Sequence, residues 1–395
     1  MMRTFLIVLL LGGISAGVYY YFWASPADAP PTAALGELEQ PRVTTSSAPI
    51  VDPTPSPPPA PPAPNEENQL RRQLADARAP DLDSIRFRLA ELLLLDLDRS
   101  AEGVMLLQQI TQGAGDGGGE IRGRALSLLF DRASTAGEKS ELATAVLRNG
   151  EAAPAFARSA YHLGAEAANA PEDSRQTRAW ELLSRAYFAS QDEAWRSRVR
   201  PTLQKLVQNL VLSTRMTSAA VNYTVVSGDS FGEIARRHKT TIDSIKWINN
   251  KSSDVIHPGD RLKILTGEVT IEVDKSDYRL DVRLDGKFLF SAAVGLGLEG
   301  RTPLGEFTVE LKQEKPNWHK PGQKSIPNDH PDNPLGSCWI GFKNTPEYSG
   351  YGIHGTREPD SIGKESSQGC IRLLNEDVQL LYRLTPTGTK VTIRE

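Results

Sequence analysis

Apolar residues recur at helical spacing over residues 66–215, and the positions between them are mostly alanine, arginine and glutamate. Leu89, Leu92 and Leu93 are typical of the pattern, which predicts helices with one buried face. Glycine-rich or proline-containing breaks at 113–119, 149–150 and 170–171 fit turns between helices. We expect an α-helical spacer of antiparallel helices, with a repeat-like array as an alternative, although no clear repeat period is evident.

A different pattern covers residues 222–266 and predicts a small module of the order strand, helix, helix, strand. Strands are expected at 223–226 and 261–265, and a capping box formed by Ser230 and Glu233 predicts the first helix. The second helix is expected at 241–249. Its inward-facing residues are predicted to be three isoleucines, Ile242, Ile245 and Ile248.

The last third of the chain, residues 267–395, follows mainly the period of two that is typical of strands. Asp285 and Gly286 separate two alternating segments, as a type I′ hairpin turn requires. Residues 338–342 form a further apolar strand, and only residues 375–384 are expected to be helical. The sequence therefore predicts a multidomain protein that ends in a β-rich domain.

The N-terminus predicts an extracytoplasmic location. Residues 5–24 contain no charge, and as a helix they span roughly 30 Å, about one hydrocarbon core. We expect a transmembrane anchor over residues 1–25, with a cleaved signal peptide as the alternative. Arg3 precedes the span and no basic residue follows it before Arg42, which places the N-terminus in the cytoplasm and the bulk outside, in the periplasmic space of the cell envelope.

Residues 26–65 hold thirteen of the chain's 27 prolines and predict an extended linker. The net charge of −4 gives no broad basic surface, so nucleic acid is not an expected partner. A protein partner for the helical region stays open. Two cysteines are too few for a disulfide framework or a thiolate metal site, and His319 and His330 lack a third ligand at a recognisable spacing. No metal and no cofactor are expected.

Candidate chemistry lies in the stretch from residue 352 to 377, where His354 and Cys370 both have glycine neighbours. A cysteine attacks as a thiolate, so an imidazole must take its proton, and His354 is the candidate. The N–H groups of Gly369 and Cys370 are candidate donors to an oxyanion. These groups together predict acyl transfer, whereas Cys338 is expected to be a strand residue without a chemical role.

Two resemblances follow from the motifs. Residues 223–265, with "SGDSF", "IA", "N" and "PGD" in order, resemble the LysM module, which implies binding to peptidoglycan glycan strands; a structural spacer of the same fold is the alternative. Residues 267–395, with "HGT", "SIG", "SQGCIR", "GRTPLGEF" and "NPLG", resemble the L,D-transpeptidase (YkuD-like) catalytic domain. The resemblance implies a β-rich cysteine enzyme that acts on peptidoglycan stem peptides and contributes to cell wall remodelling.

By that resemblance, Cys370 attacks a tetrapeptide stem, D-alanine leaves, and an amine from a neighbouring stem or an attached protein takes the acyl group, which gives 3-3 cross-links between stems. His354 transfers protons and the carbonyl of Gly355 orients it. Transfer to water, as in an L,D-carboxypeptidase, and a non-catalytic peptidoglycan-binding protein are the alternative functions.

The remaining motif residues have roles that the resemblance leaves less defined. Arg372 is expected either to hold a substrate carboxylate or to brace its loop, and Ser367 to shape the loop. Gln368 stands where many members have histidine, which leaves His354 as the only imidazole of the motif. Together with Ser367 and Gln368, Tyr351 and Trp318 are expected to contact substrate, Trp318 from a long proline-rich loop that resembles a covering flap.

Overall fold

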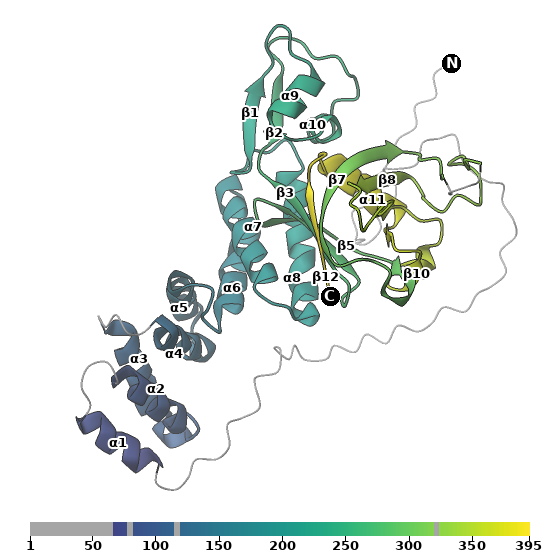
Figure 1. Cartoon of the computed structure of the whole chain (residues 1–395). Coiled ribbons are helices and arrows are strands. Elements are labelled where there is room, and N and C mark those ends of the chain that lie inside the picture. The colour runs from purple at the N-terminus through teal and green to yellow at the C-terminus, as the bar shows by residue number, and fades with distance from the viewer. Residues whose placement is uncertain (1–65, 77–81, 114–118, 320–323) are drawn as a thin grey trace, which may run out of the picture. The chain divides into compact units, whose positions relative to one another are not determined.

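The computed structural model describes residues 66–76, 82–113, 119–319 and 324–395 (Figure 1). The predicted anchor at 1–25 and linker at 26–65 lie outside these residues. Within the described ranges, no helix combines the length and the apolar character that crossing a membrane requires.

The helical region follows the predicted pattern, and α3, α5 and α6 end at or next to the three predicted breaks. α3 ends in a cap at Gly113, and α5 ends at Gly150, whose φ of 110° suits glycine. His162 is a structural residue here, since its Nε2 lies 3.0 Å from Ser140 Oγ. The helices are α1 (Glu66–Asp76), α2 (Leu82–Leu93), α3 (Ser100–Gln112), α4 (Gly119–Arg132), α5 (Ala136–Asn149), α6 (Phe156–Ala168), α7 (Asp173–Phe188) and α8 (Glu193–Leu206).

The module that follows has the predicted βααβ order. β1 (Ala220–Thr224) pairs antiparallel with β2 (Arg261–Leu265), and the helices α9 (Phe231–Arg237) and α10 (Ile242–Ile248) lie between them in sequence. Ser230 caps α9 by accepting from Glu233 N, as the capping box predicts. The prediction for Ile242 is wrong: 41% of it is exposed, because it begins a short helix and its side chain points back past the helix start.

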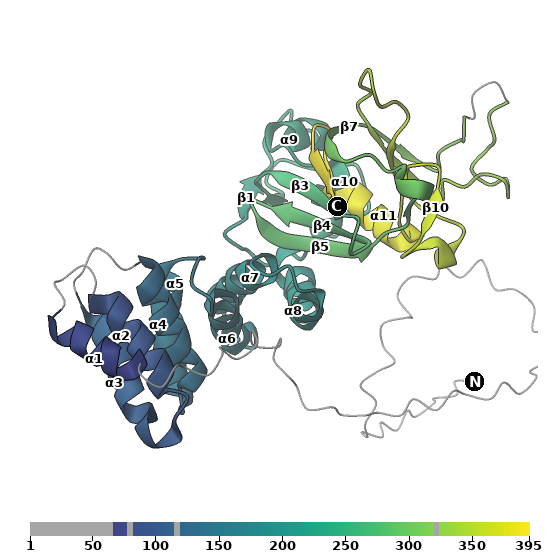
Figure 2. The same ribbon diagram turned by 60° about the horizontal axis from the view of Figure 1, so that its bottom comes forward.

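The C-terminal domain is built on one mixed sheet with the strand order β11-β9-β8-β7-β12-β3-β4-β5. Figure 2 shows β3, β4 and β5 side by side in this sheet. The hairpin between β4 and β5 turns at Asp285 and Gly286, both with positive φ as predicted. α11 (Asn375–Leu384) is the predicted helix and packs against β8. The strands are β3 (Val269–Asp274), β4 (Arg279–Leu284), β5 (Lys287–Ala293), β6 (Leu296–Gly297), β7 (Gly305–Glu314), β8 (Cys338–Phe342), β9 (Gly352–His354), β10 (Glu365–Ser367), β11 (Ile371–Arg372) and β12 (Lys390–Arg394).

The helices α7 and α8 share a hydrophobic core with this sheet. Trp180 of α7 is fully buried, and its Nε1–H donates to Phe288 O on β5 at 2.7 Å. Ser184 Oγ accepts from Phe288 N at 3.1 Å, so α7 satisfies both backbone groups of that residue. This part of the helical region therefore contributes a layer to the C-terminal core.

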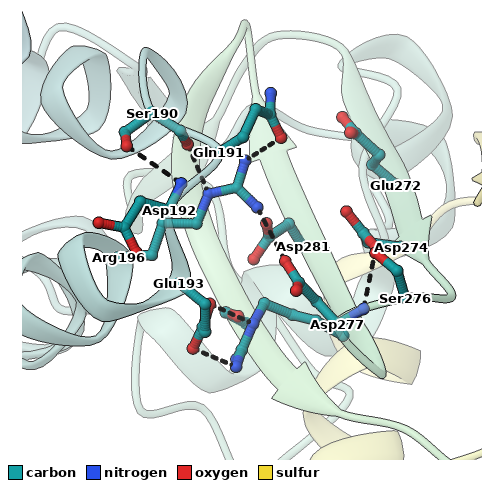
Figure 3. Close-up of polar contacts among 12 residues, drawn as sticks. Ser190, Gln191, Asp192, Glu193, Arg196, Glu272, Asp274, Ser276, Asp277 and Asp281 are labelled. Atoms are coloured by element: carbon teal, nitrogen blue, oxygen red, sulfur yellow. Dashed lines mark hydrogen bonds and ion pairs between the residues drawn. The ribbon is translucent and has the colours of Figure 1, made fainter. Parts of the chain in front are cut away.

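Charged groups accompany the apolar contact between α8 and the sheet (Figure 3). Glu193 accepts from Arg279 of β4, and the buried Arg196 lies 3.8 Å from Asp277. Asp281 of β4 is also buried; it accepts from Tyr187 OH at 2.9 Å, and burial raises its pKa. Removing one partner from such a network leaves a buried charge unpaired, which is unfavourable. The network therefore favours one position of α7 and α8 on the sheet.

A buried lysine joins the βααβ module to the end of the helical region. Lys263 of β2 is 4% exposed, and its ammonium donates to the carbonyl oxygens of Leu210 and Val211 at 2.8 and 2.7 Å. It also donates to Ser213 O at 2.8 Å and to Arg215 O. Leu210 and Val211 end the π-helix Val207–Val211 that continues from α8, where cations are favourable, and Ser213 and Arg215 follow it.

Candidate active site

The register of two short parallel strands places the predicted nucleophile and base on neighbouring strands. Ile371 of β11 pairs with Ile353 of β9, and Arg372 pairs with His354. Cys370 directly precedes this pairing, so it lies at the level of Gly352. Since alternate residues of a strand point to the same face, Cys370 and His354 project from the same face of the pair.

The imidazole of His354 is enclosed and held in one orientation. The residue is 4% exposed, its ring stacks on Trp339 at 5.9 Å between centroids, and Nδ1 lies 2.6 Å from Gly355 O. Because a carbonyl only accepts, Nδ1 carries the proton and Nε2 is left as the basic nitrogen. Burial lowers the pKa of His354 to about 4, against the opposing effect of the Gly355 carbonyl. The imidazole is therefore neutral at neutral pH.

The thiol of Cys370 is half-buried and lies 3.7 Å from Gly350 O. Burial raises its pKa above the ordinary value, while the backbone of Gly352 and the charge of Arg372 act in the opposite direction. The free site thus holds a neutral thiol and a neutral imidazole on adjacent strands. In such a site the proton moves from sulfur to Nε2 only as the sulfur attacks.

The loop before Cys370 is shaped by Ser367. Its Oγ donates to Cys370 O at 2.6 Å and accepts from Gly369 N at 3.1 Å. Gly369 has φ of 136°, and a Cβ there would lie 2.7 Å from the ring of Tyr351. The structure therefore places Tyr351 against the nucleophile loop. Gly369 N–H donates to Ser367 Oγ in this state, and its role as an oxyanion donor stays a prediction.

Two other predicted residues, Gln368 and Trp318, lie in different loops. Gln368 is exposed. Trp318 exchanges backbone hydrogen bonds with Ile326 at 2.8 and 2.9 Å inside the loop between β7 and β8, and its contact with substrate stays a prediction. That loop is organised by Asn333, which is fully buried and donates to Pro316 O, Ile326 O and Pro327 O.

Arg372 makes an ion pair near the reacting groups. Its Nη1 donates to Glu358 Oε2 at 2.8 Å, and the side chains are 12% and 73% exposed respectively. Its backbone is fixed by reciprocal hydrogen bonds with Gly295 at 2.8 and 2.9 Å. The strand therefore sets the position of the arginine, whereas its carboxylate partner is mostly in solvent.

Sequence reasoning missed Asn375, which braces the segment that holds His354. Its Oδ1 accepts from Ser337 N and its Nδ2 donates to Thr356 O, both at 2.9 Å. A Cβ on Gly355 would lie 2.2 Å from Asn375 Oδ1, which explains the glycine after His354. The only available signal was the position of Asn375 at the start of a predicted helix, where a side-chain role toward the loop is one of several uses of asparagine.

The second cysteine has surroundings of a different kind. Cys338 is 3% exposed, and burial raises the pKa of its thiol to about 11. Such a thiol is a poor nucleophile at neutral pH. Among residues 66–76, 82–113, 119–319 and 324–395, no group of three histidine, cysteine or acidic side chains is arranged to hold a metal ion.

Comparison with known proteins gives two domain matches. The L,D-transpeptidase catalytic domain, YkuD, matches residues 268–393, and the LysM domain matches residues 223–265. The chain is 43% identical over 135 residues to YqjB of Bacillus subtilis, which is named as an L,D-transpeptidase; the match covers 33% of this chain and 74% of that protein.

Two further similarities concern a second relative and a solved structure. The Bacillus licheniformis protein YkuD, also named as an L,D-transpeptidase, is 32% identical over 43% of this chain and 97% of its own length. The solved catalytic domain of the E. faecium L,D-transpeptidase is 23% identical, covers 33% of this chain and 98% of that domain, and has a TM-score of 0.27. Because the matches to the two Bacillus proteins exceed 30% identity and cover 74% and 97% of their lengths, the chain belongs to the L,D-transpeptidase family.

Proposed function

We propose that this protein is a peptidoglycan L,D-transpeptidase of the cell envelope in which Cys370 forms an acyl-enzyme and His354 transfers the protons. The observation that carries the proposal is the shared face of β9 and β11, with Nδ1 of His354 fixed on Gly355 O. The substrate is a tetrapeptide stem of peptidoglycan, and the product is a 3-3 cross-link.

The reaction begins with the neutral pair. As Sγ of Cys370 bonds to the carbonyl carbon of the L-centre of the third stem residue, its proton passes to Nε2 of His354. Collapse of the tetrahedral adduct breaks the peptide bond, and the imidazolium gives its proton to the departing amine of D-alanine. A thioester remains. The amine of a second stem then attacks it, His354 accepts a proton from that amine, and the thiol is regenerated.

The decisive experiment is incubation of the purified protein with sacculi rich in tetrapeptide stems, followed by mass spectrometry of the released muropeptides. Dimers with 3-3 cross-links are expected from the wild type and from Cys338→Ser, which is the matched control. Cys370→Ser is expected to form none. Conversion of tetrapeptides to tripeptides without dimers would identify a carboxypeptidase instead, with water as the acceptor.

The LysM domain binds peptidoglycan and, in this proposal, raises the local concentration of stems without taking part in the chemistry. Replacing residues 226–258 by a flexible linker, which keeps β2 and the contacts of Lys263, should weaken co-sedimentation with insoluble peptidoglycan and leave turnover of a soluble muropeptide nearly unchanged. Unchanged co-sedimentation would show that the module serves only as a spacer.

A membrane anchor formed by residues 1–25 completes the proposed arrangement, and it rests on the uncharged segment from 5 to 24. The protein should remain in the membrane fraction after carbonate extraction, and deletion of residues 1–25 should release it. Recovery of a mature form that lacks these residues would show a cleaved signal peptide.

A further inference from the structure

Arg372 occupies a place in the site that suits substrate recognition. It follows Cys370 by two residues, roughly 7 Å along an extended strand, and pairs in register with His354. Its positive charge lowers the pKa of both groups, which places the guanidinium within electrostatic reach of each. An arginine so close to a nucleophile and its base is positioned for whatever part of the substrate lies next to the bond that breaks.

The hydrogen bonding of this guanidinium is incomplete. Nη1 contacts one oxygen of Glu358 at 2.8 Å and Ser366 Oγ at 3.5 Å, whereas Nε is buried and has no acceptor. A guanidinium can bind a carboxylate through two parallel N–H groups, so a single contact uses only part of its capacity. Buried donors without partners are rare in folded proteins. The free Nε–H of Arg372 therefore indicates that the ion pair with Glu358 does not determine where the guanidinium lies.

The present partner, Glu358, is poorly suited to be a structural brace. Its side chain is 73% exposed, and an ion pair with so exposed a member contributes little to folding. The backbone of its loop is held independently, since Glu358 N donates to Thr356 Oγ1 at 3.0 Å and Ser361 Oγ donates to Glu358 O at 2.6 Å. The carboxylate can therefore leave Arg372 by side-chain rotation alone, without disturbing the loop.

We propose that Arg372 is the carboxylate-binding residue of the donor site, and that Glu358 occupies it in the free enzyme as an internal substitute for the substrate carboxylate. The inference rests on the proposed function, in which the leaving D-alanine bears a free carboxylate one residue beyond the bond that breaks. With its amine near His354, which must protonate it, the carboxylate of D-alanine falls on the side of Arg372. The donor displaces Glu358 and gains the second N–H contact that the internal carboxylate does not make.

The proposal predicts opposite effects for the two partners. Glu358→Gln removes the competing charge and should lower KM for a soluble tetrapeptide donor several-fold. Arg372→Gln should raise KM for the same donor about 10- to 100-fold, and Arg372→Lys should recover only part of the loss, because a lysine cannot form the paired contact. A donor whose terminal carboxylate is replaced by an amide should respond little to any of the three substitutions.

The test measures release of D-alanine or D-alaninamide by mass spectrometry for the wild type and these variants, with the melting temperature as the control for folding. Equal losses on both donors in Arg372→Gln, or no gain in Glu358→Gln, would overturn the proposal and leave Arg372 as a brace. Calorimetric binding of the tetrapeptide and its amide to Cys370→Ala provides a readout without turnover. If binding discriminates the two donors but the wild type forms no product, the proposed function fails while the carboxylate site stands.

Discussion

The acylation of Cys370 should be nearly independent of pH down to about pH 5, which is unusual for a site that depends on histidine. The reaction requires a neutral imidazole, and burial lowers the pKa of His354 to about 4. At pH 5 such a group is roughly 90% neutral, whereas an imidazole at the ordinary value of 6.5 would be only about 3% neutral. The two cases therefore differ roughly 30-fold in the predicted rate at that pH.

The assay is single-turnover acylation by a carbapenem between about pH 4 and pH 8, followed by loss of β-lactam absorbance and by the mass gain of the protein. The fall in rate toward acid pH should be centred near 4 in the wild type and be absent from His354→Ala. Arg372→Gln should move it upward, because the charge of Arg372 contributes to the lowered pKa. A fall centred near pH 6.5 in the wild type would refute the reasoning.

Folding must be monitored at each pH, because the same lowered pKa affects stability. The unfolded chain has the higher histidine pKa, so it binds more protons than the folded chain between about pH 6.5 and pH 4. His354 therefore contributes most to the free energy of unfolding above pH 6.5, and this contribution falls by about 3 kcal/mol as the pH is lowered to about 4. Circular dichroism at each pH separates this loss from the kinetic effect.

Three further predictions concern single side chains. Asn375→Ala should lower the free energy of unfolding in urea by about 2 kcal/mol and slow acylation, because two hydrogen bonds that hold the segment after His354 are lost. Asn375→Asp keeps only the bond from Ser337, so its free energy of unfolding should lie between those of the wild type and Asn375→Ala. Lys263→Met should cost about 3 kcal/mol in the same assay, since several carbonyls lose their donor, and an unchanged midpoint would contradict that role. Gln368→Ala should slow carbapenem acylation far less than His354→Ala, whose effect should reach about 10²- to 10⁴-fold, and equal losses would refute a single base.

Local signals in the sequence predicted much of the fold. The turn at Asp285 and Gly286 and the cap at Ser230 follow from backbone preferences that do not depend on the rest of the chain. The helix at 375–384 was predicted with the bounds that the structure has. The site followed from a motif in which the spacing of His354 and Cys370 reflects adjacent parallel strands.

Contacts between distant segments could not be predicted in the same way. The bonds from α7 to Phe288 join residues more than a hundred positions apart, and nothing local distinguishes Trp180 from any other helix tryptophan. The ion pair of Arg372 with Glu358 could not be predicted either, because the chain contains many acidic residues that an arginine could contact. The low pKa of His354 depends on complete burial, which appears only when Trp339 and the neighbouring strands close around the ring.

The bonds from α7 to β5 also bear on solubility, because β5 is the last strand of its sheet. An exposed edge strand offers its backbone groups to other chains, and proteins protect such edges to prevent aggregation. Here Trp180 donates to the outward C=O of Phe288 and Ser184 accepts from its N–H, and Phe288 is itself fully buried. A fragment cut at residue 267 would leave this apolar edge open, so recombinant production of the catalytic domain should include α7 and α8.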